Sequence, residues 1–200
     1  GVTRLLLGGS FPATPGAYQS SFGGIFDIGI LKYDSLGKDL LFATYLGGGG
    51  SECAHSLIVN NNKELILLGT TSSPDYPVTP QAIDKVFNSG AQNTGVIGIP
   101  YSLGSDLIIT KFNADGSELS ASTFLGGTAN DGLNINEGPL TRNYGDEMRG
   151  DVIVDVEGNI YIASVTSSFD FPISGGYSAG YKGGDTDGIV VKMSPDLSAI

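Results

Sequence analysis

The stretch DIGILKYDSLGKDLLFATYLGG (27–48) returns along the chain as DLIITKFNADGSELSASTFLGG (106–127), and its first half returns again as DGIVVKMSPDLSAI (187–200). Two further segments recur in the same order. SFPATPGAY (10–18) returns as DYPVTPQAI (75–83) and DFPISGGYS (170–178), and LIVNNNKELILLGTTSS (57–73) returns as VIVDVEGNIYIASVTSS (152–168). Several matches in a fixed order do not arise by chance, so the chain is built of an internal repeat.

The spacing of the matches divides the chain into units. Pro12 and Pro77 are 65 residues apart, whereas Pro77 and Pro172 are 95 apart. The excess in the second unit predicts two insertions, at 91–104 and 134–149. We therefore expect the end of a preceding unit at 1–10, one unit at 11–76, a second unit with both insertions at 77–171, and the start of a third at 172–200.

Each unit is predicted to hold four strands. Apolar, β-branched and aromatic residues gather in short runs, and the turns DSLG (34–37) and NADG (113–116) place Asp or Asn first and Gly last, as tight turns prefer. The expected strands are 27–33, 39–46, 56–60 and 64–70 in the first unit, and 106–112, 118–125, 151–155 and 159–165 in the second. The pattern therefore predicts an all-β, antiparallel protein.

Four-stranded antiparallel units that repeat are typical of the blades of a β-propeller. The alternative is a row of small β-sandwich modules, but a sandwich of 65 residues needs more than four strands to bury its faces. Since a closed ring needs four or more blades, we expect a segment of two to three blades of a larger propeller, with unpaired strand edges at each end.

Composition narrows the function classes. The chain has 200 residues, with 31 Gly and 9 Pro, which disfavour helix interiors. Its formal net charge of −11 repels phosphate backbones and anionic lipid headgroups, so we do not expect it to bind nucleic acid or an anionic membrane surface. No apolar run approaches ~18 residues, so we expect no membrane insertion. The single cysteine, Cys53, excludes an internal disulfide framework.

At these motifs the sequence resembles the bacterial β-propeller repeat family SBBP. The resemblance is carried by the strand Asp27 to Lys32, by LLFATYLGG (40–48), by GNIYIASVTSS (158–168) and by FPATPGAY (11–18). It implies a protein that is secreted by a Gram-negative bacterium or displayed on its surface. The family includes proteins exported by type IX secretion. The resemblance implies no catalytic residues. From the residues themselves we expect no cofactor, with calcium at DTDG (185–188) as the alternative that stays open.

The insertions are the segments in which a specific function is expected, because the first unit forms its scaffold without them. Tyr and Arg are common anchors of interfaces, and both insertions contain such residues. The candidate binding residues are Tyr101 in the first insertion and Arg142, Tyr144, Asp146, Glu147 and Arg149 in the second. We expect the two insertions to lie side by side on one face, opposite the tight turns.

For the other motifs we favour a structural interpretation over a functional one. Asp27, Asp106 and Asp187 recur before the first strand of each unit, and we expect them to cap backbone N–H groups. DTDG (185–188) offers alternating oxygen ligands for calcium but lacks a closing Glu. Cys53 and His55 are too few for a metal site, and GGGG (47–50) lacks the Lys-Ser/Thr of a phosphate loop.

The leading expectation for function is therefore a non-catalytic module that binds a protein, a surface glycan or other domains of its own chain. Two alternatives stay open: an enzyme that acts on polysaccharide with carboxylates on its loop face, for which Asp146 and Glu147 are the candidates, and a purely structural spacer. We also expect the recurring apolar positions to be buried between blades, namely Ile30, Tyr33, Leu57, Val59, Ile109, Phe112, Val152 and Val154.

Overall fold

The computed structural model describes residues 2–3, 11–96, 98–134, 148, 150–176 and 180–200. Among these residues there is no α-helix, and all strand pairs within the sheets are antiparallel. The described part of the chain contains no helix with the length and apolar character needed to cross a membrane. The prediction of an all-β, antiparallel protein is confirmed.

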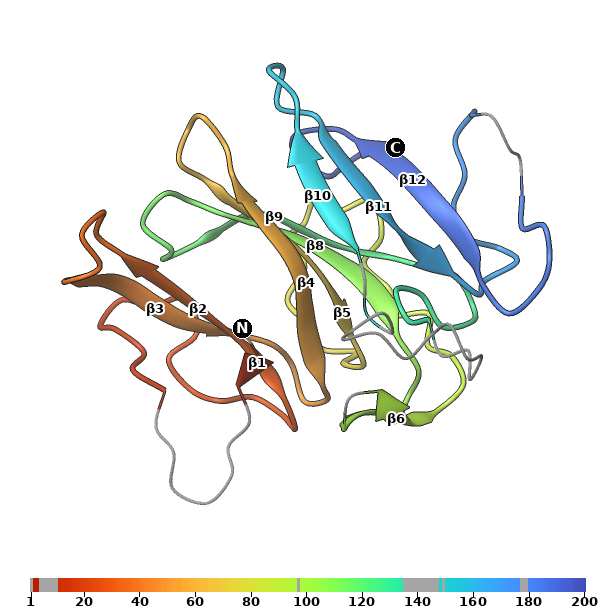
Figure 1. The fold of residues 1–200 in the computed structure, drawn as a ribbon, viewed down its shortest axis with the longest axis horizontal. Helices are drawn as coiled ribbons and strands as arrows, with labels where there is room; N and C mark the ends of the chain where they lie inside the picture. The colour runs from red at the N-terminus through yellow and green to blue at the C-terminus, as the bar shows by residue number, and fades with distance from the viewer. Residues whose placement is uncertain (1, 4–10, 97, 135–147, 149, 177–179) are drawn as a thin grey trace.

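Three sheets follow one another along the long axis of the molecule (Figure 1). The first sheet has the order β1-β2-β3, the middle sheet β4-β5-β8-β9 and the third sheet β10-β11-β12, and β6 and β7 form a small separate hairpin. The strands are β1 (Val2–Thr3), β2 (Asp27–Tyr33), β3 (Leu40–Leu46), β4 (Glu52–Val59), β5 (Leu65–Thr71), β6 (Asn93–Val96), β7 (Ile99–Tyr101), β8 (Asp106–Phe112), β9 (Leu119–Leu125), β10 (Asp151–Val154), β11 (Ile160–Thr166) and β12 (Asp187–Met193).

All eight predicted strands are present, most within one residue of their expected bounds. The sheets, however, do not coincide with the sequence units 11–76 and 77–171. The middle sheet joins β4 and β5 of the first unit to β8 and β9 of the second, so the sheet is offset from the repeat by two strands. The reason is the connections: the short loop 47–51 passes from one sheet to the next, whereas the long segment 72–105 returns to the same sheet.

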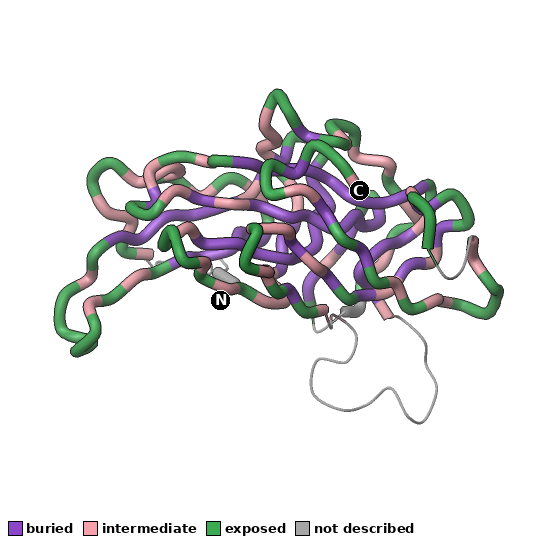
Figure 2. The backbone as a smooth tube through the Cα atoms, turned by 90° about the horizontal axis from the view of Figure 1, so that it is seen from above, coloured by how far each residue is buried: buried purple, intermediate pink, exposed green. Residues whose placement is uncertain are grey.

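The middle sheet buries most of both faces of β5, β8 and β9. One face packs against the first sheet, where Leu67, Phe112 and Phe124 meet Ile28 and their neighbours in one apolar cluster. The other face packs against the third sheet in a second cluster, with members Leu68, Ile109, Leu125, Val152, Ile162 and Met193. Figure 2 shows the resulting distribution, with buried segments through the interior and exposed segments at the turns and ends. Each fully buried Leu or Phe stabilises the fold by about 1.5–3 kcal/mol.

A repeated lysine contact joins each sheet to the next. Lys32 Nζ donates to the carbonyl oxygen of Ala114 at 2.8 Å, and Lys111 Nζ donates to that of Pro195 at 3.0 Å. Lys32 and Lys111 occupy equivalent positions in β2 and β8, and both acceptors lie in the tight turn that follows the first strand of the next unit. The second and third sheets are therefore placed by the same interaction.

The proline-containing segments cover the outer edges of two sheets. The backbone N–H of Thr14 donates to Ala43 on β3 at 2.9 Å, and that of Thr79 donates to Ser122 on β9 at 2.9 Å. The hydroxyl of each threonine accepts from the same strand residue, at 3.0 Å in both cases. Since an uncovered edge strand can pair with other chains, the recurring (F/Y)PxT motif protects β3 and β9.

The predicted burial is confirmed for most of the recurring apolar positions and wrong for three of them. Ile30, Ile109, Phe112 and Val152 are buried, and Val154 is partly buried against the core. Tyr33, Leu57 and Val59 are more than half exposed, contrary to the prediction. Tyr33 lies on the face of the first sheet that points away from the middle sheet, and the described residues of the first sheet do not reach over Leu57 and Val59.

Candidate functional site

The first insertion folds back onto the body of the protein. Its hairpin, β6 and β7, pairs Asn93 with Tyr101. Tyr101 has no exposed surface and belongs to an apolar cluster with Phe26, Cys53, Ile99 and Leu133. Met148, from the second insertion, packs against the same cluster.

A line of polar contacts passes through this cluster. His55 Nε2 lies 3.2 Å from Thr70 Oγ1, Thr70 Oγ1 lies 2.9 Å from the Tyr101 hydroxyl, and that hydroxyl donates to Met148 Sδ at 3.3 Å. Burial lowers the pKa of His55 to about 4, so the imidazole is neutral at pH 7. One consistent assignment of the protons has His55 donating to Thr70 and Thr70 donating to Tyr101.

The two insertions therefore meet, as the strand alternation predicts, through Tyr101 and Met148. The prediction that Tyr101 is available to a partner is wrong, because its ring is buried and its hydroxyl is bonded within the chain. The other candidate binding residues, Arg142, Tyr144, Asp146, Glu147 and Arg149, lie outside the described residues.

Removal of the tyrosine hydroxyl tests this contact. We expect Tyr101→Phe to lower the free energy of unfolding by about 1 kcal/mol, because Thr70 and Met148 lose a buried hydrogen-bond partner. Urea denaturation measures the change, and Tyr33→Phe is the matched control because Tyr33 is 51% exposed. An equal effect of the two substitutions would contradict the assigned role of Tyr101.

A second arrangement recurs at the junction of each pair of sheets, and we call it the acid clamp. In the first clamp, Glu52 is fully buried at the start of β4. It accepts hydrogen bonds from Thr71 Oγ1 at 2.6 Å, from Ser73 Oγ and from the backbone N–H of Gly48 at 3.1 Å. The carboxylate thereby ties the loop between β3 and β4 to the end of β5.

Asp27 completes the first clamp from the start of β2. It accepts from the backbone N–H groups of Gly23 and Gly24 at 2.7 and 3.2 Å and from Gln19 Nε2 at 3.1 Å. A side chain on Gly47 would overlap with both acids of this clamp, so glycine is required where the two carboxylates approach the backbone.

The second clamp repeats the first with Asp131 in place of the glutamate. Asp131 accepts from Thr166 Oγ1, from Ser168 Oγ at 2.9 Å and from the backbone N–H of Gly127 at 2.8 Å. Asp106 faces it across Gly126, whose Cβ, if present, would lie 2.7 Å from Asp131 Oδ2 and 2.8 Å from Asp106 Oδ1. Two independent copies show that the clamp belongs to the repeat itself.

The recurring aspartates before the first strands cap backbone N–H groups, as predicted. Asp27 caps two glycines, Asp106 accepts from Asn88 N at 2.8 Å, and Asp187 accepts from the backbone N–H of Lys182. The aspartate therefore recurs in all three units because it caps backbone N–H groups before the first strand.

Burial changes the protonation of the clamp acids. Loss of hydration raises the pKa of Glu52 to about 7, that of Asp106 to about 8 and that of Asp131 to about 6, although the hydrogen bonds they accept oppose the rise. Burial also raises the pKa of Asp27. The Oδ1 atom of Asp106 is buried with no hydrogen-bond partner, which is consistent with a protonated acid at neutral pH. Because these acids have almost no exposed surface, they cannot contact a polysaccharide.

The sequence contains a signal for the clamp that motif reasoning missed. TTSSPD (70–75) and VTSSFD (165–170) supply the hydroxyls of both clamps, and Asp75 and Asp170 bind the backbone of the opposite loop, at Gly49 N and Thr128 N respectively, both at 2.8 Å. The sequence alone shows that Thr-x-Ser-x-Asp recurs in both units together with Leu-Gly-Gly. The central acid is less visible in the sequence, because it is a glutamate, Glu52, in the first unit and an aspartate, Asp131, in the second.

The cysteine and the glycine run have structural roles. Cys53 is buried, as expected, and its burial raises its pKa to about 11, so it is not a reactive thiol. The backbone N–H groups of Gly49 and Gly50 donate to Asp75 and Ser73 within the chain. Within the described residues, no three His, Cys, Asp or Glu side chains are grouped closely enough to hold a metal ion.

No protein-family model matches the chain, and no curated protein matches it.

Proposed function

We propose that the chain is an interaction module of the β-propeller type, acting outside the cell or at its surface, with the insertion face as its binding surface. Three observations support propeller blades: the serial packing of antiparallel sheets, the lysine contact repeated at each junction, and the acid clamp repeated at each junction. The resemblance of its motifs to the SBBP repeat supports the extracellular setting.

The observation that carries the binding proposal is the meeting of the two insertions. Both are additions to a repeat that folds without them in the first unit, and their described residues Tyr101 and Met148 meet in one cluster. The partly buried contact between Tyr101 and Met148 packs these two residues against the cluster that contains Cys53 and Leu133. Binding residues are often carried by loops that a rigid scaffold holds in position. We infer that the body of this protein holds its two insertions in this way, so that one partner can contact both.

The partner we propose is a protein or a surface glycan. The chain has a formal net charge of −11, which opposes binding to anionic polymers such as nucleic acids. Tyr144, Arg142 and Arg149 in the second insertion are residue types that favour aromatic and bidentate contacts with glycans and proteins.

A deletion that copies the first unit tests the proposal. Removal of residues 134–149 joins Leu133 to Gly150, which reproduces the direct step from Ala54 to His55 in the first unit. We expect this variant to fold, with an unchanged far-ultraviolet circular dichroism spectrum, and to lose binding in two assays. These are a microarray of defined glycans and affinity capture from the secreted proteins of a Gram-negative culture.

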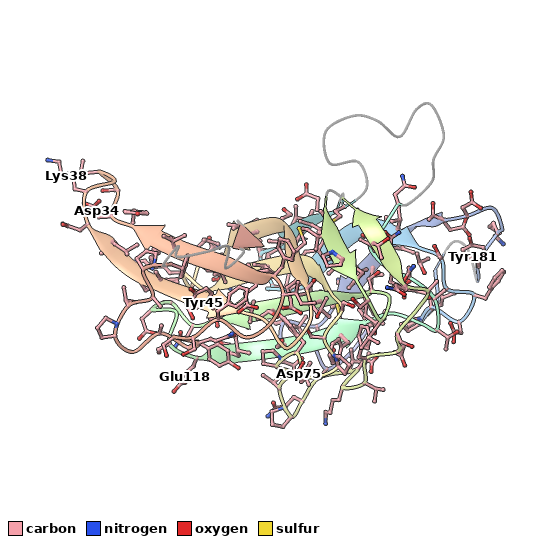
Figure 3. All side chains as sticks on the ribbon, turned by 90° about the horizontal axis from the view of Figure 1, so that it is seen from below. Asp34, Lys38, Tyr45, Asp75, Glu118 and Tyr181 are labelled. Carbon is pink, nitrogen blue, oxygen red and sulfur yellow. The ribbon has the colours of Figure 1, made fainter. Side chains whose placement is uncertain are left out.

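The control variant changes the opposite face. Lys38→Ala with Lys63→Ala alters two tight turns, and Figure 3 shows Lys38 and Asp34 at the far end of the first sheet. We expect this variant to bind like the unmodified chain. Binding that survives the deletion and disappears in the turn variant would move the binding surface to the tight-turn face.

A further inference from the structure

Two exposed aromatic rings contact each other in the segment that joins β11 to β12. Phe169 is 80% exposed, and its ring centroid lies 4.5 Å from that of Tyr181, with an angle of 54° between the ring planes. Figure 3 shows Tyr181 at the end of the molecule opposite Asp34 and Lys38. Adjoining apolar groups at a protein surface are a signature of a binding site.

The exposure of the two rings is a property of their positions in the repeat. The repeat spacing places Phe169 at the position of Pro74, and Tyr181 at the position of Ser21. Pro74 is exposed although the middle sheet packs against a sheet on each face, and Ser21 is exposed although the first sheet contains β3. The scaffold therefore leaves these positions open where the surrounding strands are complete, and it does not require an aromatic residue at either of them.

Hydrogen bonds hold the aromatic pair in place. The Tyr181 hydroxyl donates to the carbonyl oxygen of Gly184 at 2.8 Å, which fixes the direction of its ring. Ser167 Oγ, two residues before Phe169, donates to the carbonyl oxygen of Asp185 at 2.9 Å and so joins the two parts of the segment. A surface that is arranged before binding loses little conformational freedom when a ligand arrives.

We propose that Phe169 and Tyr181 form a stacking platform for a neutral pyranose sugar, at a site separate from the two insertions. A pyranose with equatorial hydroxyls presents C–H groups on its faces, and the negative face of an aromatic ring attracts them. The hydroxyls at the sugar rim need hydrogen-bond partners. Lys182 and Asp185 are exposed beside Tyr181 in the sequence, and they supply a donor and an acceptor.

The surroundings of the rings favour a neutral sugar over an acidic sugar or a protein. Asp170 and Asp185 lie next to the rings in the sequence, and the whole chain has a formal net charge of −11, so an acidic sugar is repelled. Three of the five residues from 180 to 184 are glycine, which offer no side chains to an interface. A protein partner typically buries about 800 Å² on each side, whereas a sugar ring needs only the two aromatic faces.

A titration with cellotetraose, a neutral oligosaccharide of equatorially substituted glucose, tests the platform. We expect saturable shifts in amide NMR spectra, centred on Phe169 and Tyr181, with a Kd of about 1 mM, and no such shifts with the acidic tetragalacturonate. Phe169→Ala and Tyr181→Ala are each expected to weaken binding at least tenfold, because a stacking face is lost. Phe169→Tyr keeps the ring and is expected to bind like the unmodified chain, as is Tyr33→Ala, which removes an exposed ring elsewhere.

The outcome is separable from that of the insertion face. Neither ring lies in residues 134–149, so their deletion is expected to leave the cellotetraose titration unchanged. A complex with a Kd of about 1 mM does not survive the washing of a glycan microarray, so the array reports on the insertion face alone. The proposal would be overturned by absence of saturation up to about 10 mM cellotetraose, by binding that persists in both alanine variants, or by binding that is lost in the deletion variant.

Discussion

Gly126→Ala is expected to lower the free energy of unfolding by about 3 kcal/mol and the melting temperature by about 10 °C. The new methyl group would lie 2.7 Å from Asp131 Oδ2 and 2.8 Å from Asp106 Oδ1, both of which are buried. Gly127 and Ser168 donate hydrogen bonds to Asp131, and Asn88 donates to the other carboxyl oxygen of Asp106, so neither acid can move far without breaking a contact. Thermal and urea denaturation measure the loss.

Gly188→Ala is the matched control for this substitution. Gly188 lies on β12, and a Cβ there would meet nothing within 4 Å. Since neither Gly126 nor Gly188 has a positive φ, both variants make the same chemical change without backbone strain. We expect Gly188→Ala to leave stability within about 0.5 kcal/mol of the original. Similar losses in the two variants would show that the clamp does not constrain the glycine.

The strands could be predicted from the sequence, but the sheets could not. Short runs of β-branched and aromatic residues between turn signals give the strand positions, because both signals are local. Which strands pair depends on where a connection leads. Loop 47–51 is short and yet passes to another sheet, whereas segment 72–105 is long and returns to the same one. Neither length nor composition of a connection contains this information.

The sequence predicts where the candidate site lies, but it does not predict which of its side chains are buried or which residues contact one another. The meeting of the two insertions follows from strand alternation alone. The burial of Tyr101 does not, because a tyrosine suits an interface and an interior equally well, and only the presence of Thr70 and Met148 beside its hydroxyl distinguishes them. The acid clamp needs side chains from four segments, including Glu52 and Ser73, which only the fold brings together.

The second large effect is a loss of stability with rising pH. Between pH 6.5 and 8.5 the free energy of unfolding is expected to fall by about 2–3 kcal/mol. The folded-state pKa values of Asp106 and Glu52, about 8 and 7, lie above the ordinary values of 3.8 and 4.5, so in this range the folded protein holds protons that the unfolded chain has already released. Stability from such groups is fully present below the unfolded pKa and is lost as pH rises through the folded pKa.

Other titrating groups act outside this window or weakly within it. Hydrogen bonds from Ser117 lower the pKa of Asp115, so its contribution is lost only below about pH 4. Burial lowers the pKa of His55 to about 4 from 6.5, so this residue adds stability as pH rises to about 6.5 and little beyond. The range from pH 6.5 to 8.5 therefore isolates the clamp acids.

Two variants and one salt series separate the clamp from the net charge of −11. Asp106→Asn is expected to remove more than half of the pH dependence, because the pKa of Asp106 is higher than that of Glu52 or Asp131. Asp115→Asn, on an exposed turn, is expected to leave it unchanged. Repulsion among surface charges is screened in about 0.5 M NaCl, whereas the desolvation of buried carboxylates is not. A pH dependence that disappears in salt and persists in Asp106→Asn would assign the effect to the surface and not to the clamp.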